Sequence, residues 1–108
     1  MAIPNLDIFQ VIADPSRRQI LELLTKDSYN INSLAENFEM SRPAVSKHIS
    51  ILQIAGFISI NEIGRERYCT IKQDGFTELR NWMSYFDSFW TLKLTKLEAT
   101  LNQKRKNK

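Results

Sequence analysis

The stretch SRPAVSKHISIL, residues 41–52, decides how the rest of this 108-residue chain folds. Its apolar residues Val45, Ile49 and Leu52 fall at positions i, i+4 and i+7, which places them on one stripe of an α-helix. At 3.6 residues per turn, small, hydroxyl-bearing and cationic side chains project from the opposite side, and none of them is a carboxylate. A face of this kind can lie against a phosphate-lined groove.

The residues before this stretch complete a two-helix unit. Ser41 is a natural N-cap for a helix over residues 42–55, and residues 39–40 form a tight turn before it. An earlier short helix is expected over residues 33–38, with Asn32 as its N-cap. Two such helices joined by a turn of three or four residues match the helix-turn-helix pattern. The side chains that the earlier helix is expected to bury are Leu34, Ala35 and Phe38.

A hairpin is expected directly after the two helices. Residues 57–62 and 67–71 are rich in β-branched and aromatic side chains and partly alternate with polar ones, which favours two strands. Residues 63–66 would form the turn between them. We therefore predict a mainly α protein with a small β-hairpin, a winged helix-turn-helix of about five helices and a two-stranded wing.

Two further helices are expected before this unit. The first covers residues 5–12. The second follows Asp14 and Pro15, an N-cap and a favoured first helical residue, and runs to about residue 24. Residues 26–30 are expected to be a polar connection. The expected inner face of the first helix is Leu6, Phe9 and Ile12, and that of the second is Ile20, Leu21 and Leu24.

A long helix is expected over residues 74–102. Its apolar residues are spaced three or four apart and average close to 3.6, so they form one stripe. A stripe of this length exceeds what one small core can cover, and a second copy of the chain is the expected partner. Its members are Phe76, Leu79, Met83, Phe86, Trp90, Leu94, Leu97 and Leu101. The predicted dimer interface comprises Leu6, Phe9, Met83, Phe86, Trp90, Leu94, Leu97 and Leu101.

Composition sets further limits. We predict one domain over residues 1–103 and a basic disordered tail over residues 104–108, because four cations fall in the last five residues. The formal net charge is +3, so the folded part is nearly neutral and charge alone is weak support for nucleic-acid binding. A single cysteine, no apolar run long enough to span a membrane and no secretion signal lead us to expect a cytoplasmic protein without membrane partners.

The pattern resembles the ArsR family of bacterial winged-helix repressors. The resemblance is carried by residues 14–24 (DPSRRQILELL), by Leu34 and Ala35, by residues 41–49, and by later residues. These later residues are Leu52, residues 55–58 (AGFI), Gly64 and Arg65. The family implies a homodimer that binds a pseudo-palindromic operator on double-stranded DNA and blocks transcription.

The spacing of aromatic and leucine residues in the last helix is similar to the subgroup that lacks metal sites. Metal-sensing members carry a Cys-x-Cys pair on the third helix, or His and acidic residues on the last. Residues 32–38 (NSLAENF) contain no cysteine, the last helix contains no histidine, and Cys69 with His48 cannot supply the roughly four ligands that zinc needs. We expect no metal and no cofactor; an effector ligand cannot be named.

The helix over residues 42–55 is expected to enter the major groove with its N-terminal half. The residues expected to contact DNA there are Ser41, Arg42, Pro43, Ser46 and Lys47, and Arg65 and Arg67 at the wing suit the adjacent minor groove or its phosphates. His48 lies between the two faces of the helix, so a contact with DNA and a half-buried structural role both stay open. Ion pairs of the wing arginines with Glu62 and Glu66 are the alternative for the wing.

Three other features have two interpretations each. Arg17 and Arg18 either bind the DNA backbone or face water. Cys69 is interpreted as a strand residue rather than a redox sensor, because no second thiol accompanies it. The aromatic stripe on the last helix is interpreted as core or dimer interface rather than as a ligand pocket.

The chain lacks the parts of an enzyme. One histidine, no nucleophile with a base beside it, no phosphate-binding glycine loop and no metal cluster leave no catalytic group to propose. The competing hypothesis is a winged-helix protein-interaction module that does not bind DNA, since a fold alone does not fix function. Such a module should expose large apolar groups on the face that here carries Ser, Lys and Arg.

Overall fold

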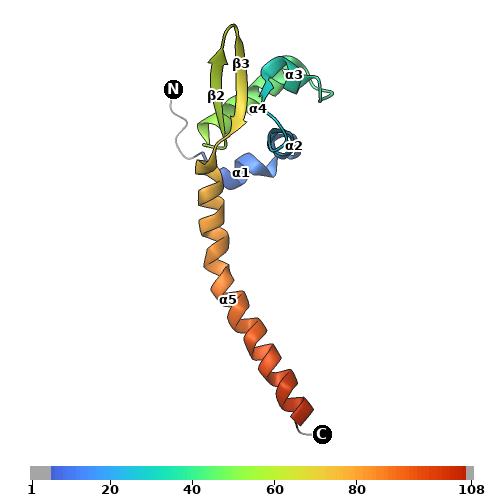
Figure 1. Cartoon of the computed structure of the whole chain (residues 1–108), viewed down its shortest axis with the longest axis vertical. Helices are drawn as coiled ribbons and strands as arrows, with labels where there is room; N and C mark the ends of the chain where they lie inside the picture. Colours follow the sequence, from blue (N-terminus) through green and yellow to red (C-terminus); the bar gives the residue numbers. More distant parts are fainter. Residues whose placement is uncertain (1–5, 107–108) are drawn as a thin grey trace. The chain divides into compact units, whose positions relative to one another are not determined.

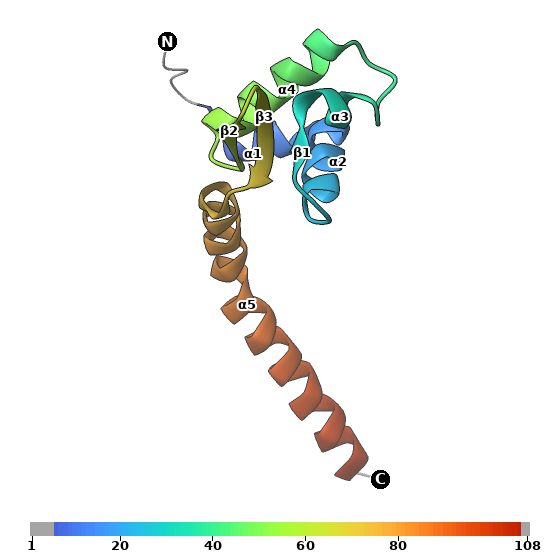
Figure 2. The same ribbon diagram turned by 45° about the horizontal axis from the view of Figure 1, so that its top comes forward.

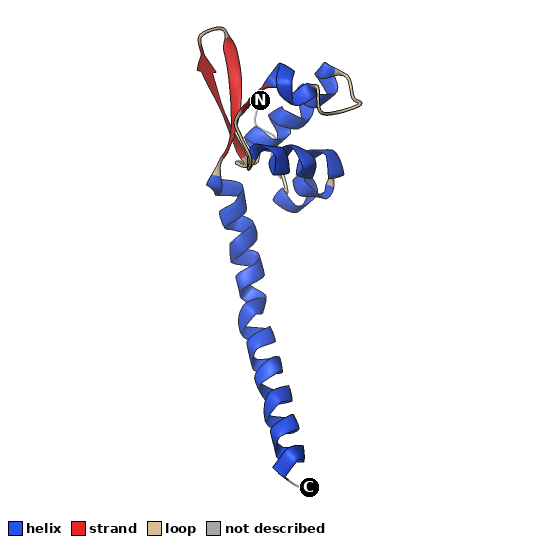
Figure 3. Cartoon of the chain, turned by 45° about the vertical axis from the view of Figure 1, so that its right-hand side comes forward, coloured by secondary structure: helices blue, strands red, loops and turns tan. Residues whose placement is uncertain are grey.

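A computed structural model of the chain describes residues 6–106 (Figures 1 and 3). Its contacts divide the chain into two compact units, residues 1–78 and 79–108, and each is described by itself. The elements in order are α1 (Ile8–Ala13), α2 (Pro15–Leu24), β1 (Tyr29–Asn30), α3 (Ile31–Ala35), α4 (Arg42–Ile54), β2 (Ile58–Ile63), β3 (Glu66–Ile71) and α5 (Gln73–Lys106). Five helices and a small antiparallel sheet confirm the predicted winged helix-turn-helix. No helix in the described range is long and apolar enough to cross a membrane.

The first helix buries a different face from the one predicted. The Asp7 side chain caps α1 by accepting a hydrogen bond from the N–H of Phe9 at 2.9 Å. Ile8 and Val11 are buried, whereas Phe9 is 37% exposed. The predicted inner face of Leu6, Phe9 and Ile12 is therefore wrong for the core, since a six-residue helix offers too few turns for periodicity to choose between adjacent faces. The expected start at residue 5 lies outside the described residues.

Asp14 ends α1 and caps α2. Its carboxylate accepts hydrogen bonds from the N–H groups of Ser16 (2.8 Å) and Arg17 (3.2 Å). Desolvation raises the pKa of Asp14, but these two hydrogen bonds, the charge of Arg17 and that of His48 when its ring is protonated outweigh it, so the pKa of Asp14 is lowered. The predicted bounds of α2 and its three buried residues are confirmed.

The third helix begins earlier than predicted. Asn30, not Asn32, is its N-cap, and the Asn30 side chain accepts from the N–H of Ser33 at 2.7 Å. Capping at Asn30 allows Ile31 to be buried in the first turn together with Leu34. The helix ends at Ala35, so residues 36–38 are not part of it. Two residues that were expected to be buried, Ala35 and Phe38, are only half-buried.

The fourth helix agrees with the prediction to within one residue. Ser41 caps it by accepting from the N–H of Ala44 at 3.3 Å. Val45, Ile49 and Leu52 are at most 1% exposed, so the predicted apolar stripe faces the core. This fixes the opposite side of α4 as its outer face.

The sheet has three strands rather than the predicted two. The order is β1-β3-β2, and β2 pairs with β3 in the register Ile58↔Ile71 to Ile63↔Glu66. The two-residue strand β1, expected to be a connection, pairs antiparallel with the other edge of β3 through Tyr29↔Cys69 (Figure 2). Gly64 in the turn adopts φ +65°, a conformation that only glycine reaches without strain.

Cys69 lies in the middle strand and is fully buried, which supports its interpretation as a strand residue. Burial raises the pKa of its thiol, and the nearby charge of Arg67 offsets this only in part.

The start of α5 packs directly on the core of the first unit. A Cβ on Gly75 would lie 2.8 Å from the ring of Phe57, and the N–H of Gly75 donates to the carbonyl of Gly56 at 2.8 Å. The Phe57 ring also stands edge-on to that of Phe76, with centroids 5.0 Å apart. Only glycine permits this approach of helix to ring.

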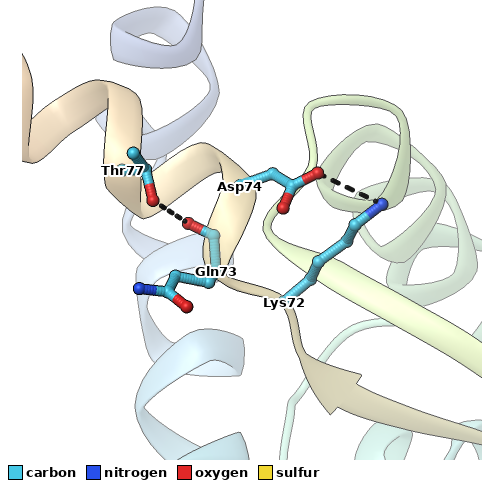
Figure 4. Close-up of polar contacts among 4 residues, drawn as sticks. All are labelled: Lys72, Gln73, Asp74 and Thr77. Carbon is cyan, nitrogen blue, oxygen red and sulfur yellow. Dashed lines mark hydrogen bonds and ion pairs between the residues drawn. The ribbon is translucent and has the colours of Figure 1, made fainter.

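The first turn of α5 carries two local polar contacts (Figure 4). Lys72 Nζ lies 3.5 Å from Asp74 Oδ2, and Thr77 Oγ1 donates to the carbonyl of Gln73 at 3.1 Å. The helix continues to Lys106, beyond the predicted end at residue 102. Residues 104–106, which were expected in a disordered tail, are therefore helical; residues 107 and 108 lie outside the described residues. The prediction of one domain over residues 1–103 stays a prediction.

Candidate nucleic-acid interface

A groove of about 220 Å³ lies between the N-terminal half of α4 and the wing. The groove is formed by three parts of the chain that are distant in the sequence: the first turn of α3, α4, and the β2–β3 turn with β3. The lining residues are Asn30, Ile31, Asn32, Arg42, Ser46, Arg65, Glu66 and Arg67. Three guanidinium groups therefore line one groove.

The groove brings together four of the residues that were predicted to contact DNA. Arg42 and Ser46 come from α4, and Arg65 and Arg67 come from the wing. Ser41, Pro43 and Lys47 do not line it, but all three are exposed at the start of α4. Within residues 6–106, the side chains of Lys47, Arg65 and Arg67 form no hydrogen bond or ion pair, so their charges are available to an anion.

The Arg42 side chain is hydrogen-bonded through its Nε. Its Nε donates a hydrogen bond to Oδ1 of Asn32, the residue that was predicted to cap α3. Both side chains are exposed, so the contact lies on the surface that DNA would approach. The terminal nitrogens of Arg42 form no hydrogen bond within the described residues.

The carboxylate of Glu66 is bound by neutral groups and not by the wing arginines. Its Oε2 accepts from Tyr68 Oη at 2.7 Å and from Asn30 Nδ2 at 3.2 Å. The hydrogen bond to Glu66, and then its charge, raise the pKa of Tyr68. The ion pair within the described part of the chain joins Lys72 and Asp74, so the alternative of ion-paired wing arginines is not observed.

Arg17 and Arg18 support the fold. Arg17 Nε donates to the carbonyl of Val11 at 2.6 Å, and Arg18 Nη1 donates to the carbonyls of Ile12 (2.7 Å) and Ala13 (2.9 Å). These carbonyls lie in the last turn of α1, where helical partners are absent. Both arginines thus cap α1, which is neither of the two roles predicted for them.

His48 is half-buried and lies against Arg17. Its Nδ1 is 3.4 Å from Nη1 of Arg17, which lets a neutral imidazole accept from the guanidinium. This contact favours the structural role over direct binding of DNA, although it links the outer part of α4 to the junction of α1 and α2.

Four residues of the groove were not predicted from the sequence: Asn30, Ile31, Asn32 and Glu66. The two asparagines were assigned to a connection and a cap, and Glu66 was considered only as an ion-pair partner. A pair of asparagines two residues apart before a helix was the available signal, because only one of them can cap it.

The second unit presents a long apolar face on α5. Trp90 is 59% exposed and Leu94 is 62% exposed, and the other α5 residues predicted for the dimer interface are exposed as well. A hollow of about 350 Å³ opens among the aromatic side chains of this helix. Its lining residues are Trp82, Met83, Phe86, Asp87 and Trp90.

The described residues contain no group of three or more His, Cys, Asp or Glu side chains that could hold a metal ion.

Comparison with known proteins identifies the family. The family described as "Bacterial regulatory protein, arsR family" matches residues 14–59, which span α2, the helix-turn-helix and the start of the wing. The transcriptional repressor SdpR of Bacillus subtilis (strain 168) is 35% identical over 80 residues, 74% of this chain and 89% of that protein. The chain belongs to the arsR family.

Other similar proteins agree with this arsR-family assignment. The HTH-type transcriptional regulator Rv2034 of Mycobacterium tuberculosis is 34% identical over 87 residues, 81% of this chain and 78% of that protein. The crystal structure of an ArsR family transcriptional regulator aligns with TM-score 0.70 and 36% identity over 78% of this chain and 87% of that one. The chain is thus a DNA-binding transcription regulator of the arsR family, and this family consists of regulators rather than enzymes.

Proposed function

We propose that this arsR-family regulator is a homodimeric repressor that binds a pseudo-palindromic operator and does not sense metal. The observation that carries the DNA part is the groove that places Arg42 and Ser46 of α4 beside Arg65 and Arg67 of the wing. Arginines at the start of a recognition helix reach base edges in the major groove, and wing arginines reach the adjacent minor groove or its phosphates.

The outer face of α4 supports DNA over a protein partner. Its exposed side chains near the N-terminus are polar, cationic or small, with Pro43, Lys47 and Ser50 among them. A docking surface for protein would be expected to present large apolar groups there. The N-terminal half of α4 therefore favours DNA over a protein partner.

The exposed apolar stripe of α5 supports the dimer. Ten large hydrophobic side chains from residue 82 to residue 101 are exposed, a patch that a monomer in water rarely leaves uncovered. A second copy of the same helix offers a matching surface under two-fold symmetry. Two recognition helices related by that symmetry would contact half-sites about 34–36 Å apart, which makes the operator a pseudo-palindrome.

Repression is supported by the similarity to SdpR. SdpR is a transcriptional repressor, and a dimer seated on an operator excludes other proteins from that DNA. The hollow among the α5 aromatics could hold a ligand only if the dimer leaves it open, so the proposal assigns it to the interface.

The test is selection of bound DNA from a random pool by the full chain, followed by sedimentation of the protein with and without the selected fragment. We expect an inverted repeat and a dimer. The double substitution Trp90→Glu with Leu94→Glu should give monomers that bind the repeat poorly. A selected site without two-fold symmetry, or a dimer that survives both substitutions, would refute the proposed assembly.

A further inference from the structure

Hydrogen bonds link the first turn of α3 to both walls of the groove, the wing and α4. Asn30 donates to Glu66 of the wing at 3.2 Å, and Asn32 accepts from Arg42 of α4. The only residue between the two asparagines is Ile31, which is buried in the core. Because Ile31 is buried, the core fixes the backbone from which the two amide side chains extend.

Arg42 is the side chain that such a hydrogen bond orders most. It stands at the first helical position after the Ser41 cap, where its long side chain has no neighbour on the preceding turn to order it. The hydrogen bond to Asn32 uses the single N–H of Nε. The four N–H groups of the two terminal nitrogens stay available, and these can donate in parallel to O6 and N7 of a guanine.

We propose that Asn32 is a positioning residue for Arg42, which it holds in place to recognise a guanine in the operator. The inference rests on the proposed function, since it needs a DNA site. Asn32 acts through Arg42 and is not itself assigned a base.

The expected effect concerns sequence preference more than affinity. In a specific complex the Arg42 side chain must be ordered on one base. Without Asn32, the whole entropic cost of that ordering weakens DNA binding. Ordering one long side chain weakens binding by about 2- to 10-fold. In a non-specific complex Arg42 is not ordered on a base, so the loss should be confined to the correct sequence.

The test measures binding of the full chain to its selected fragment and to fragments in which each G·C pair of one half-site is changed. Arg42→Ala should abolish the preference at one G·C pair, a loss of about 5- to 150-fold. Asn32→Ala should lower the preference at the same pair by about 2- to 10-fold. Asn32→Gln, which moves the acceptor by one methylene, should do the same. In the Arg42→Ala background, Asn32→Ala should have no further effect, because the two residues act as a pair.

Two controls define the role of the acceptor. Asn32→Asp keeps an oxygen at the same place and should keep the preference, although its charge lowers affinity for all fragments. Asn37→Ala removes a neighbouring exposed asparagine whose side chain, among the described residues, donates to the carbonyl of Ser33, and should change neither the sequence preference nor the affinity.

The outcomes separate the two proposals. If Asn32→Ala and Asn32→Gln leave the preference intact while Arg42→Ala abolishes it, the positioning role is refuted and the DNA-binding proposal stands. An equal loss on every fragment would also refute it, because Arg42 would then contact phosphate. If the wild-type chain selects no DNA, both proposals fail.

Discussion

Removal of both wing arginines, Arg65→Ala with Arg67→Ala, should flatten the salt dependence of DNA binding. Each phosphate that a protein neutralises contributes about −0.9 to the slope of log K against log salt concentration. If Arg42 binds a base, the cations left for phosphates are Lys47, Arg65 and Arg67, or about six in a dimer. The expected slope is then about −5, an affinity loss of about 10³-fold between 50 and 200 mM salt.

The double variant retains Lys47 alone in each protomer. The magnitude of its slope should fall to about 2, which corresponds to an affinity loss of about 10-fold over the same range. Fluorescence anisotropy with the selected fragment, at four or five salt concentrations, measures both slopes. Both arginine side chains are exposed and form no hydrogen bond or ion pair within the described residues, so the fold should be unaffected, and circular dichroism checks this.

Lys72→Ala is the matched control. Lys72 follows the same strand but lies at the end opposite the turn, beside Asp74. Its removal should leave the slope within about one of the wild-type value. A double variant whose slope equals that of the wild type would show that the wing does not contact phosphate, and the groove would lose its role as a DNA interface.

Three further predictions concern the core, the cap and the groove. Gly75→Ala should lower the free energy of unfolding by about 1–3 kcal/mol in urea titrations, because the new Cβ would lie 2.8 Å from the fixed ring of Phe57. Asp14→Ala should lower it by about 0.5–2 kcal/mol at pH 7. Since the folded pKa of Asp14 is lowered, that difference is present above its ordinary value of 3.8 and should shrink as the pH falls through the folded value. Glu66→Gln should tighten DNA binding severalfold at 50 mM salt, because it removes the carboxylate from the groove.

Each of these has its own control. Gly75→Ala should lower the free energy of unfolding by less in a Phe57→Leu background. An equal decrease would exclude the ring contact as the cause. Asp14→Ser keeps a capping oxygen and should retain most of the stability at pH 7; a loss as large as that of Asp14→Ala would point away from the cap. Glu36→Gln removes an exposed carboxylate outside the groove, and an equal gain in affinity from it would reduce the Glu66 effect to net charge.

The parts of the fold that were predictable from sequence are those with several turns or a strong local signal. The stripe Val45, Ile49, Leu52 with its Ser41 cap defined α4 to within one residue, because a 13-residue helix repeats its pattern over more than three turns. The Asp14–Pro15 start of α2 was equally clear.

Short elements were not predictable in the same way. The six residues of α1 and five of α3 are set by which neighbour supplies the cap and by what the core must bury. Asn30 and Asn32 are equally good caps, and only the burial of Ile31 decides between them. The strand β1 depends on pairing between Tyr29 and Cys69, which are 40 positions apart, and two residues carry no alternation to reveal it.

The candidate site was predictable in its cations but not in its neutral partners. Arg42, Arg65 and Arg67 stand out because charge and helix position identify them. Glu66 and the two asparagines matter through contacts across the groove, and no spacing along the chain indicates such contacts. Arg17 likewise contacts both the carbonyl of Val11 and the ring of His48, and the spacing of these residues along the chain does not indicate either contact.

The division of α4 into two faces has a consequence for how this protein can diverge. Val45, Ile49 and Leu52 are confined to the core, whereas Lys47 and Ser50 are exposed on the outer face, and the Lys47 side chain forms no hydrogen bond or ion pair within the described residues. A substitution on the outer face can therefore change which DNA is bound while leaving folding intact. Duplicated copies of such a gene could acquire separate operators through single substitutions, with no compensating change elsewhere in the chain.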